Sequence, residues 1–369
     1  MIFKLVPISV WDDKKVKERL SWYYDVIRSK RPAKYLICKS VRTKLDIKNS
    51  KTSELWEEHE RLSKITRNKI EEIKSTEYLE NIESYENNFL DLKSEIANRA
   101  LDSCNLCEWN CHVNRNEGEI GVCRLDKTTR VSSWFRHFGE EAPLVNTNGS
   151  GTIFFTGCMF RCVFCQNWEI SQYPLAGEAV DGINLAEIMK DLHQQGAHNI
   201  NFVGGEPTPN IHTIIEGMRN LDVNIPMLWN SDMYATSDTM RLLIDIMDIW
   251  LPDFKYGNDD CAKRLSNIPN YFTMISRNHK FVVEHNGDMI IRHLVLPNHF
   301  DCCTKPILGW ISENCKRVLV NVMGQYRPEY RVKKNPKQYS DIARPLETAE
   351  IQRAYDYAEK CGLVYRSVS

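Results

Sequence analysis

Residues 156–168 read Thr-Gly-Cys-Met-Phe-Arg-Cys-Val-Phe-Cys-Gln-Asn-Trp, which places Cys158, Cys162 and Cys165 in a C-x3-C-x2-C spacing. Three thiolates on one short loop can converge on a cubane iron-sulfur cluster, and they leave one iron without a protein ligand. An open metal position can bind a substrate or cofactor, whereas closed ligand sets are typical of structural sites. Zinc and buried free cysteines explain the spacing less well, because zinc generally takes a fourth protein ligand and core packing does not require this spacing. The triad therefore predicts a catalytic [4Fe-4S] site.

The chain from Gly151 onward alternates short apolar segments with helical stretches, a pattern typical of parallel βα units. We expect six strands, at residues 152–155, 199–203, 226–229, 248–251, 289–296 and 317–322. Helices are expected between them, at residues 185–195, 210–220, 237–246 and 261–277. Six such units make an open or partial barrel. Because active sites in parallel α/β folds collect where strands end, motifs directly after a strand carry functional weight.

Composition limits the classes of protein to which the chain can belong. Its 369 residues hold 48 Lys and Arg against 49 Asp and Glu, so binding to nucleic acid is not indicated. Seven of the 13 cysteines fall in two tight groups between Cys104 and Cys165, which favours ligation over a disulfide scaffold. No stretch approaches the length of apolar sequence that spans a membrane. We expect a soluble cytoplasmic protein with reduced thiols and no membrane association.

The sequence divides into four expected parts. Residues 1–100 are polar and charged and form a helical N-terminal extension, with helices expected at 54–74 and 89–102. The remaining parts are a cysteine-rich metal- or cluster-binding segment at 101–146, an α/β core at 147–335 and a C-terminal helical segment at 336–369 with a helix at 348–361.

An upstream group of cysteines forms a complete ligand set. Cys104, Cys107, Cys111 and Cys123 have the spacing C-x2-C-x3-C-x11-C, and four thiolates imply a closed site. Three close cysteines and a distant fourth favour ferredoxin-type ligation of a second [4Fe-4S] cluster, with zinc as the alternative. Such a site could relay electrons or dock a partner, or it could be a structural clip in a segment with little core.

The cluster loop resembles that of a known superfamily. Cys158, Cys162, Phe164 and Cys165, with an aromatic residue before the last cysteine, are similar to the loop of radical S-adenosylmethionine (SAM) enzymes. The resemblance implies that the amino and carboxylate groups of SAM occupy the open iron. It also implies that an electron from the reduced cluster splits the sulfonium to give a 5'-deoxyadenosyl radical.

A second motif strengthens the resemblance. Residues 203–208 read Val-Gly-Gly-Glu-Pro-Thr directly after an expected strand. Glycines let a ligand approach the backbone, and Glu206 offers a carboxylate to an ammonium group. The superfamily uses this segment to hold the amino group of SAM, so the resemblance implies that Gly204, Gly205 and Glu206 bind SAM.

Weaker resemblances add further candidate SAM contacts. Asp253-Phe-Lys255 resembles the Asp-x-Lys segment that lies beside the SAM carboxylate in glycyl-radical-enzyme activases, although a surface ion pair would have the same sequence. The stretch 291–299, Ile-Arg-His-Leu-Val-Leu-Pro-Asn-His, resembles an activase strand that ends near the adenosyl group, so His293 is a candidate contact or a core histidine.

Polar residues after the third expected strand are also candidates. Asn230 and Ser231 are well placed for ribose hydroxyls or the SAM carboxylate. Trp229 stands about where the activases carry an aspartate, so their cation-binding arrangement is not transferred to this chain.

The resemblance extends from about residue 91 to residue 328, through 131–143, Val-Ser-Ser-Trp-Phe-Arg-His-Phe-Gly-Glu-Glu-Ala-Pro, and 151–158, Gly-Thr-Ile-Phe-Phe-Thr-Gly-Cys. It is to the pyruvate formate-lyase activating enzyme-related branch often called PflX-like. The implied fold is an α/β radical SAM partial (β/α)6 barrel with the helical extension and the cysteine-rich segment. The implied cofactors are a [4Fe-4S] cluster and SAM, and the implied electron donor is a flavodoxin or ferredoxin.

The resemblance implies hydrogen abstraction, from a glycine of a partner protein if the likeness to activases extends to the substrate. Two alternatives stay open. One is radical SAM oxidation or methylation of a small molecule or peptide, since one scaffold supports many reactions. The other is a non-catalytic iron-sulfur redox or carrier protein.

Six cysteines remain outside these groups, at positions 38, 261, 302, 303, 315 and 361. The adjacent pair Cys302-Cys303 could have a redox or metal role, but no partner motif is visible nearby in the sequence. We expect single buried thiols and leave all six out of the site.

Overall fold

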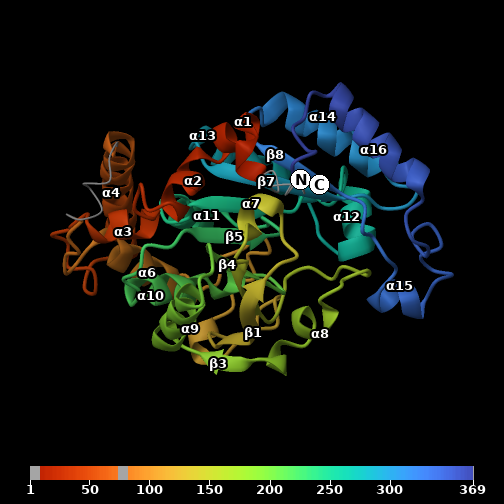
Figure 1. Ribbon diagram of the computed structural model, residues 1–369. Helices are drawn as coiled ribbons and strands as arrows, with labels where there is room; N and C mark the ends of the chain where they lie inside the picture. The colour runs from red at the N-terminus through yellow and green to blue at the C-terminus, as the bar shows by residue number, and fades with distance from the viewer. Residues whose placement is uncertain (1–8, 74–81, 369) are drawn as a thin grey trace.

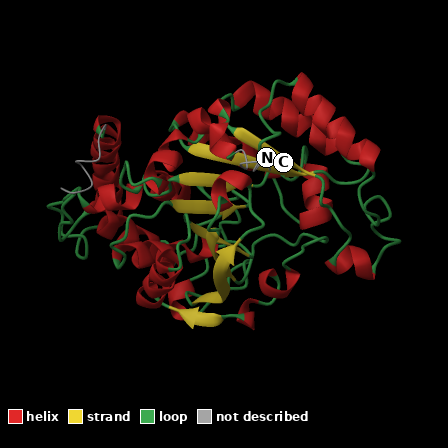
Figure 2. Ribbon diagram, viewed as in Figure 1, coloured by secondary structure: helices red, strands yellow, loops and turns green. Residues whose placement is uncertain are grey.

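The computed structural model describes residues 9–73 and 82–368 and contains one eight-stranded sheet (Figures 1 and 2). The strand order is β3-β1-β2-β4-β5-β6-β7-β8. The strands are β1 (Thr129–His137), β2 (Ser150–Phe155), β3 (Glu178–Val180), β4 (Ile200–Gly204), β5 (Met227–Ser231), β6 (Ile249–Pro252), β7 (Asp288–Leu294) and β8 (Leu319–Met323). Every neighbouring pair from β2 to β8 is parallel. The six expected strands and the partial (β/α)6 barrel are therefore confirmed.

Two strands that the sequence did not predict extend the sheet. β1 runs antiparallel to β2, and β3 runs antiparallel to β1. The register of β1 shifts between Val131 and Ser133, which breaks the alternation by which a strand is recognised in sequence.

Helices connect the parallel strands: α9 (Gly182–Gln194), α10 (Ile211–Arg219), α11 (Ser237–Ile244), α12 (Asp259–Ser266), α13 (Tyr271–Glu284) and α14 (Lys305–Asn314). The single helix expected at 261–277 is wrong, because two helices occupy this stretch. Asn267 adopts a left-handed conformation at φ 57° and ends α12, and Pro269 has no N–H with which to continue it.

The remaining helices and helical turns lie before β1, between strands, or after β8. They are η1 (Val10–Asp12), α1 (Lys14–Arg19), α2 (Ser21–Ile27), α3 (Lys34–Lys39), α4 (Thr52–Glu72), α6 (Phe89–Arg99), η2 (Arg115–Glu117), α7 (Ala142–Val145), α8 (Trp168–Ser171), η3 (Pro174–Ala176), η4 (Thr208–Asn210), η5 (Phe300–Thr304), α15 (Tyr330–Lys334) and α16 (Thr348–Lys360). The helices expected at 54–74, 89–102 and 348–361 are confirmed as α4, α6 and α16 within a few residues. No helix in the described ranges is long and apolar enough to cross a bilayer.

The N-terminal helices close one end of the barrel. One apolar cluster joins strand residues to Val16 of α1, to Leu20 and to Tyr23 of α2. The strand residues of this cluster are Leu228, Ile249, Leu251, Ile290 and Leu319. Where β6 and β7 begin, Asp248 accepts a hydrogen bond from Trp22 Nε1 at 2.7 Å, and Asp288 accepts one from the Tyr23 backbone N–H at 2.8 Å. Figure 1 shows α1 and α2 beside β7 and β8. This leaves the carboxyl ends of the strands for the site.

Candidate functional site

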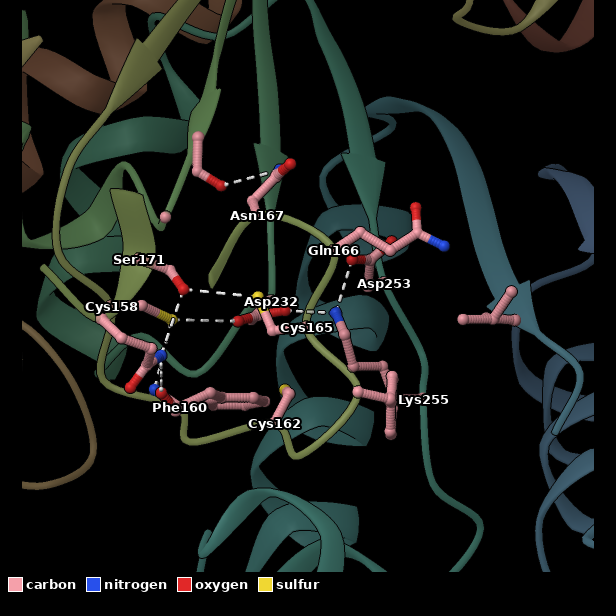
Figure 3. Close-up of a pocket in the computed structure, with 15 residues that line it drawn as sticks. Cys158, Phe160, Cys162, Cys165, Gln166, Asn167, Ser171, Asp232, Asp253 and Lys255 are labelled. Carbon is pink, nitrogen blue, oxygen red and sulfur yellow. Dashed lines mark hydrogen bonds and ion pairs between the residues drawn. The ribbon is translucent and has the colours of Figure 1, made fainter. Parts of the chain in front are cut away.

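A cavity of about 190 Å³ lies at the carboxyl ends of the barrel strands (Figure 3). Its wall collects side chains or backbone from the loops after β2, β4, β5 and β6: Cys158, Cys162, Cys165, Gly204, Gly205, Asp232, Asp253 and Lys255. Gln166 and Asn167, which also line it, are exposed. The location is the one at which parallel α/β folds place their active sites.

The three cysteines sit on a loop that is hydrogen-bonded to the end of α12. Arg161 and Val163 donate backbone N–H groups to the carbonyls of Ser266 and Leu265 at 2.9 and 2.8 Å. Ser266 Oγ donates to Cys162 Sγ at 2.9 Å. The end of α12 therefore holds the loop and reaches one of its sulfurs.

The thiols of the triad are free and shielded from water. Cys158 and Cys162 are buried, and Cys165 is half-buried, with its Sγ 3.3 Å from Ser171 Oγ. Burial raises the pKa of Cys162 to about 12 and that of Cys158 well above its usual value. In such surroundings a thiolate requires a nearby positive charge, which iron would supply on ligation. Three unpaired thiols on one cavity wall thus fit an iron-sulfur cluster with one open iron.

Gly204 and Gly205 allow the backbone of β4 to meet the start of the cluster loop. A Cβ on Gly205 would lie 2.0 Å from Gly157 O, and one on Gly204 would lie 2.3 Å from Phe155 O. Gly204 also has φ 117°, which a residue with a side chain rarely adopts. Packing alone therefore requires glycine at both positions, whether or not a ligand binds there.

Glu206 lies behind the cavity wall and is fully bonded within the protein. Its Oε1 accepts hydrogen bonds from Ser231 Oγ at 2.6 Å and Thr208 Oγ1 at 2.5 Å. Its Oε2 accepts the backbone N–H of Asp232 at 2.8 Å. Burial and the adjacent Asp232 carboxylate raise the pKa of Glu206 to about 7.

Lys255 connects two carboxylates in the cavity wall. Its Nζ contacts Asp232 Oδ1, and Asp253 Oδ2 at 2.5 Å (Figure 3). Burial alone would lower the pKa of Lys255, but the two carboxylates raise it well above its usual value. Arg292 donates from Nε to Asp253 Oδ1 at 2.8 Å and from Nη2 to Asn230 Oδ1 at 2.5 Å. Positive and negative side chains therefore alternate from Arg292, behind the wall, through Asp253 and Lys255 to Asp232.

The structure brings some predicted residues to the cavity and leaves others behind it. Gly204, Gly205, Asp253 and Lys255 line it, whereas Glu206, Asn230 and Ser231 are buried one layer away. His293 is also buried and is not part of the lining. Its Nδ1 lies 2.8 Å from Phe254 O, and its Nε2 lies 2.9 Å from Thr304 Oγ1.

Asp232 is the main lining residue that sequence reasoning missed. Its Oδ2 accepts from Cys158 Sγ at 3.7 Å. β5 runs to Ser231, two residues past the expected end at 229, so the polar residue directly after the strand is Asp232. A more generous strand boundary would have found it.

The upstream cysteines gather in a compact segment beside the cluster loop. A Cβ on Gly121 would lie 3.3 Å from Cys111 Sγ and 3.5 Å from Cys123 Sγ. Burial raises the pKa of Cys107 well above its usual value, and the neighbouring thiols Cys123, Cys104 and Cys111 raise it further. The chemistry of this donor set fits either iron-sulfur or zinc ligation.

This upstream segment packs directly against the loop that carries Cys158, Cys162 and Cys165. A Cβ on Gly157 would lie 3.0 Å from Cys123 O, and Arg161 hydrogen-bonds the carbonyl of Val122. The two cysteine groups are thus joined by close packing at Gly157 and by the Arg161 side chain.

Three of the cysteines left out of the site do have partners. Cys261, Cys302 and Cys303 place their sulfurs, together with a nitrogen of His299, within 4.8 Å of one another. The expectation of single buried thiols is therefore wrong for these three, and Cys302 is exposed. Cys261 and His299 are 38 positions apart in sequence, so the cluster exists only in the folded chain.

Sequence comparison finds one superfamily and two proteins to which the chain is similar. Residues 152–311 match the Radical SAM superfamily. The chain is 42% identical over 351 residues to uncharacterized protein MJ0674 of Methanocaldococcus jannaschii, covering 94% of this chain and 98% of that protein. It is 23% identical over 282 residues to uncharacterized protein MJ0808 of the same organism, covering 71% and 80%.

Two solved structures have weaker likeness. The crystal structure of Streptococcus suis SuiB bound to S-adenosylmethionine aligns with TM-score 0.40 and 14% identity, over 55% of this chain and 44% of SuiB, so the match spans less than half of that protein. TYW1 with a lysine-pyruvate adduct bound aligns with TM-score 0.36 and 12% identity, over 57% and 73%. From the sequence matches, the chain carries a radical SAM superfamily domain and belongs to the same family as the M. jannaschii protein MJ0674.

Proposed function

We propose that this chain is a radical SAM enzyme whose Cys158, Cys162 and Cys165 bind a catalytic [4Fe-4S] cluster. When bound, the cluster and SAM supply one-electron cleavage of the sulfonium, which yields a 5'-deoxyadenosyl radical that abstracts hydrogen. The observation that carries the proposal is that three free thiols share one cavity with a lysine and two carboxylates. Such a wall matches a cofactor that carries both an ammonium and a carboxylate group.

The acidic side of the cavity is the proposed site of the SAM ammonium group. Asp232 lies beside Cys158, and Glu206 bonds the backbone of Asp232 from behind. Two carboxyl groups held this close in a buried setting repel each other when both are ionised, and an incoming cation relieves that repulsion. Gly204 and Gly205 complete this side with backbone that lines the cavity.

Lys255 is the proposed partner of the SAM carboxylate. Lys255 contacts both Asp232 and Asp253, and Arg292 neutralises Asp253 from the side of the barrel interior. Asp232 is therefore the main carboxylate that competes with a ligand for the charge of Lys255. Asn230 holds Arg292, and Ser231 holds Glu206, so we assign these two residues to positioning. His293 bonds Phe254 and Thr304, and we assign it to supporting the end of β7.

We propose that the upstream set, Cys104, Cys107, Cys111 and Cys123, holds a second [4Fe-4S] cluster that passes electrons from a flavodoxin or ferredoxin. The support is its packing against the cluster loop through Val122 and Cys123. Zinc in this set would make the segment a structural clip, and metal counting separates the two.

We propose that the hydrogen donor is a glycine of a partner protein. The support is the resemblance of Asp253-Phe-Lys255 to the activases, together with exposed Gln166 and Asn167 beside the cavity. In a glycine-deuterated extract, label should enter 5'-deoxyadenosine from the protein fraction. Label entering from the small-molecule or peptide fraction would instead favour oxidation or methylation of such a substrate.

Electron paramagnetic resonance tests occupancy of the cavity by SAM. The Cys107→Ser variant removes one upstream ligand, so the signal of its reduced form should come from the Cys158 loop. Adding SAM should change that signal, because the ligand binds the open iron. A signal unchanged in excess SAM would contradict the proposal.

A further inference from the structure

A second metal-ligand group lies between the start of α12 and η5, outside the cavity. Cys261 Sγ lies 3.6 Å from His299 Nδ1 and 3.9 Å from Cys302 Sγ. Cys302 Sγ lies 3.3 Å from His299 Nδ1 and 3.9 Å from Cys303 Sγ. Cys303 Sγ lies 3.7 Å from the same Nδ1. All four donor atoms therefore surround one small volume.

These separations match the edges of a zinc tetrahedron. With Zn–S near 2.3 Å and Zn–N near 2.0–2.1 Å, tetrahedral geometry places sulfurs about 3.8 Å apart and sulfur and nitrogen about 3.6 Å apart. A disulfide would need sulfurs at about 2.05 Å, and the three cysteines are free. A cubane would bind each thiolate to a different iron, which spreads the donors more widely than a single ion does.

The histidine is oriented as a metal ligand. His299 Nε2 lies 2.9 Å from Asp341 Oδ2, and Arg264 Nη1 lies 3.2 Å from Asp341 Oδ1. Arg264 Nη2 also lies 3.2 Å from Nε2, but the Asp341 carboxylate is the nearer partner and accepts hydrogen bonds. With Nε2 protonated toward this carboxylate, as zinc ligation requires, Nδ1 turns its lone pair toward the sulfurs. A carboxylate behind the ligand in this way is the usual arrangement for histidines that bind zinc.

The Asn258 side chain and close backbone packing at Gly257 hold the donors together. Asn258 Oδ1 accepts the Cys261 N–H at 2.8 Å, and its Nδ2 donates to Cys302 O at 2.8 Å, so one side chain joins the two segments. Gly257 allows the close approach, since a Cβ there would lie 2.8 Å from Cys303 Cα. The site is preorganised, which reduces the cost of assembling it around an ion.

We propose that Cys261, His299, Cys302 and Cys303 form a closed Cys3His site for one Zn²⁺ ion. Its role is to fix α12 at the barrel. α12 begins two residues before Cys261 and ends at Ser266, which donates to Cys162 Sγ. The zinc site therefore braces the helix that supports the catalytic loop, and it stands independently of which reaction the cavity performs.

Metal counting by plasma mass spectrometry on the reconstituted full chain tests the proposal. Cys261→Ser and Cys302→Ser should each lose about one zinc per chain relative to the unaltered protein, with iron unchanged. Cys361→Ser, a thiol outside the cluster, should lose none. Cys302 is exposed, so its replacement should leave the fold intact. The zinc content of Cys302→Ser therefore tests the site if Cys261→Ser does not fold.

Zinc K-edge absorption on Cys107→Ser, whose upstream set is incomplete, should show three sulfurs near 2.3 Å and one nitrogen near 2.0 Å. Zinc content unchanged in both Cys261→Ser and Cys302→Ser, or loss of iron in place of zinc, would overturn the assignment. Neither result would bear on SAM cleavage, so failure here is distinct from failure of the proposed function.

Discussion

Lys255 joins Asp253, at 2.5 Å, to Asp232, whose other carboxylate oxygen lies 3.7 Å from the sulfur of Cys158. One cationic side chain thus connects the end of β6 to the first cysteine of the cluster loop. The arrangement combines the proposed cluster ligands with charges suited to the amino acid part of SAM.

Replacing Lys255 with methionine should weaken SAM binding. A hydrogen bond to a charged group contributes about 1.5–3 kcal/mol, so the Kd should rise about tenfold to hundredfold. Iron content should not change, because Lys255 is not a cluster ligand in this account. Titration of the reduced protein with SAM measures the effect, and Lys280→Met, which alters an exposed lysine, is the control. Equal affinity in both variants would remove Lys255 from the site.

The cluster-free protein should lose stability as pH rises from about 4.5 to about 7. Burial and Asp232 raise the pKa of Glu206 from 4.5 to about 7, so the folded state binds the proton more tightly than the unfolded state does. Protonated Glu206 therefore contributes up to about 3 kcal/mol to the free energy of unfolding. This contribution is fully present below the unfolded pKa and is lost as the pH rises through the folded pKa.

Urea unfolding at several pH values measures this contribution. Asp288 has a similarly raised pKa of about 7, so more than one carboxyl group makes the free energy of unfolding depend on pH. A variant is therefore needed to separate the effect of Glu206. Glu206→Gln should flatten the pH dependence, whereas Glu187→Gln, at an exposed helix position, should not. A slope unchanged by Glu206→Gln would show that this carboxyl group titrates near its ordinary pKa.

Gly205→Ala should disturb the cluster loop. The new Cβ would lie 2.0 Å from Gly157 O, so backbone must move, at a cost of about 1–3 kcal/mol. We expect a lower melting temperature and reduced iron incorporation. Gly309→Ala is the matched control, because its Cβ would meet Tyr357 at 3.5 Å and alanine favours a helix. Iron content equal in the two variants would show that the contact is tolerated.

Cys107→Ser should halve the iron content if the upstream set holds a second cluster. A loss of about four irons per chain, with the Cys158 cluster retained, is the expected result. Loss of about one zinc with constant iron would instead identify a structural zinc site. Iron and zinc measured together on the same sample decide between them.

The sequence predicts the barrel well because buried parallel strands have continuous apolar runs. Residues 226–229, Pro-Met-Leu-Trp, and 249–251, Ile-Trp-Leu, illustrate this, and they appear in β5 and β6. It predicts α1 and α2 poorly, because these helices are short and their apolar residues, such as Tyr23, pack inside the barrel rather than against a neighbouring helix.

From the sequence, only those site residues that lie within a short motif can be predicted. The triad falls within residues 158–165 and the two glycines are adjacent, and both motifs line the cavity. Arg292 and Asp253 lie 39 positions apart and meet only because β6 and β7 are neighbours. Likewise, His299 has no visible link to Cys261 until α12 and η5 are packed together.

The most direct test of the central claim is formation of 5'-deoxyadenosine by the anaerobically reconstituted, dithionite-reduced protein given SAM, measured by liquid chromatography. The account predicts that the unaltered protein and Cys361→Ala form it and that Cys162→Ala, which lacks one cluster ligand, does not. A fully iron-loaded protein that forms none would contradict the account and favour a non-catalytic iron-sulfur protein. Equal formation by Cys162→Ala would contradict the assignment of the triad.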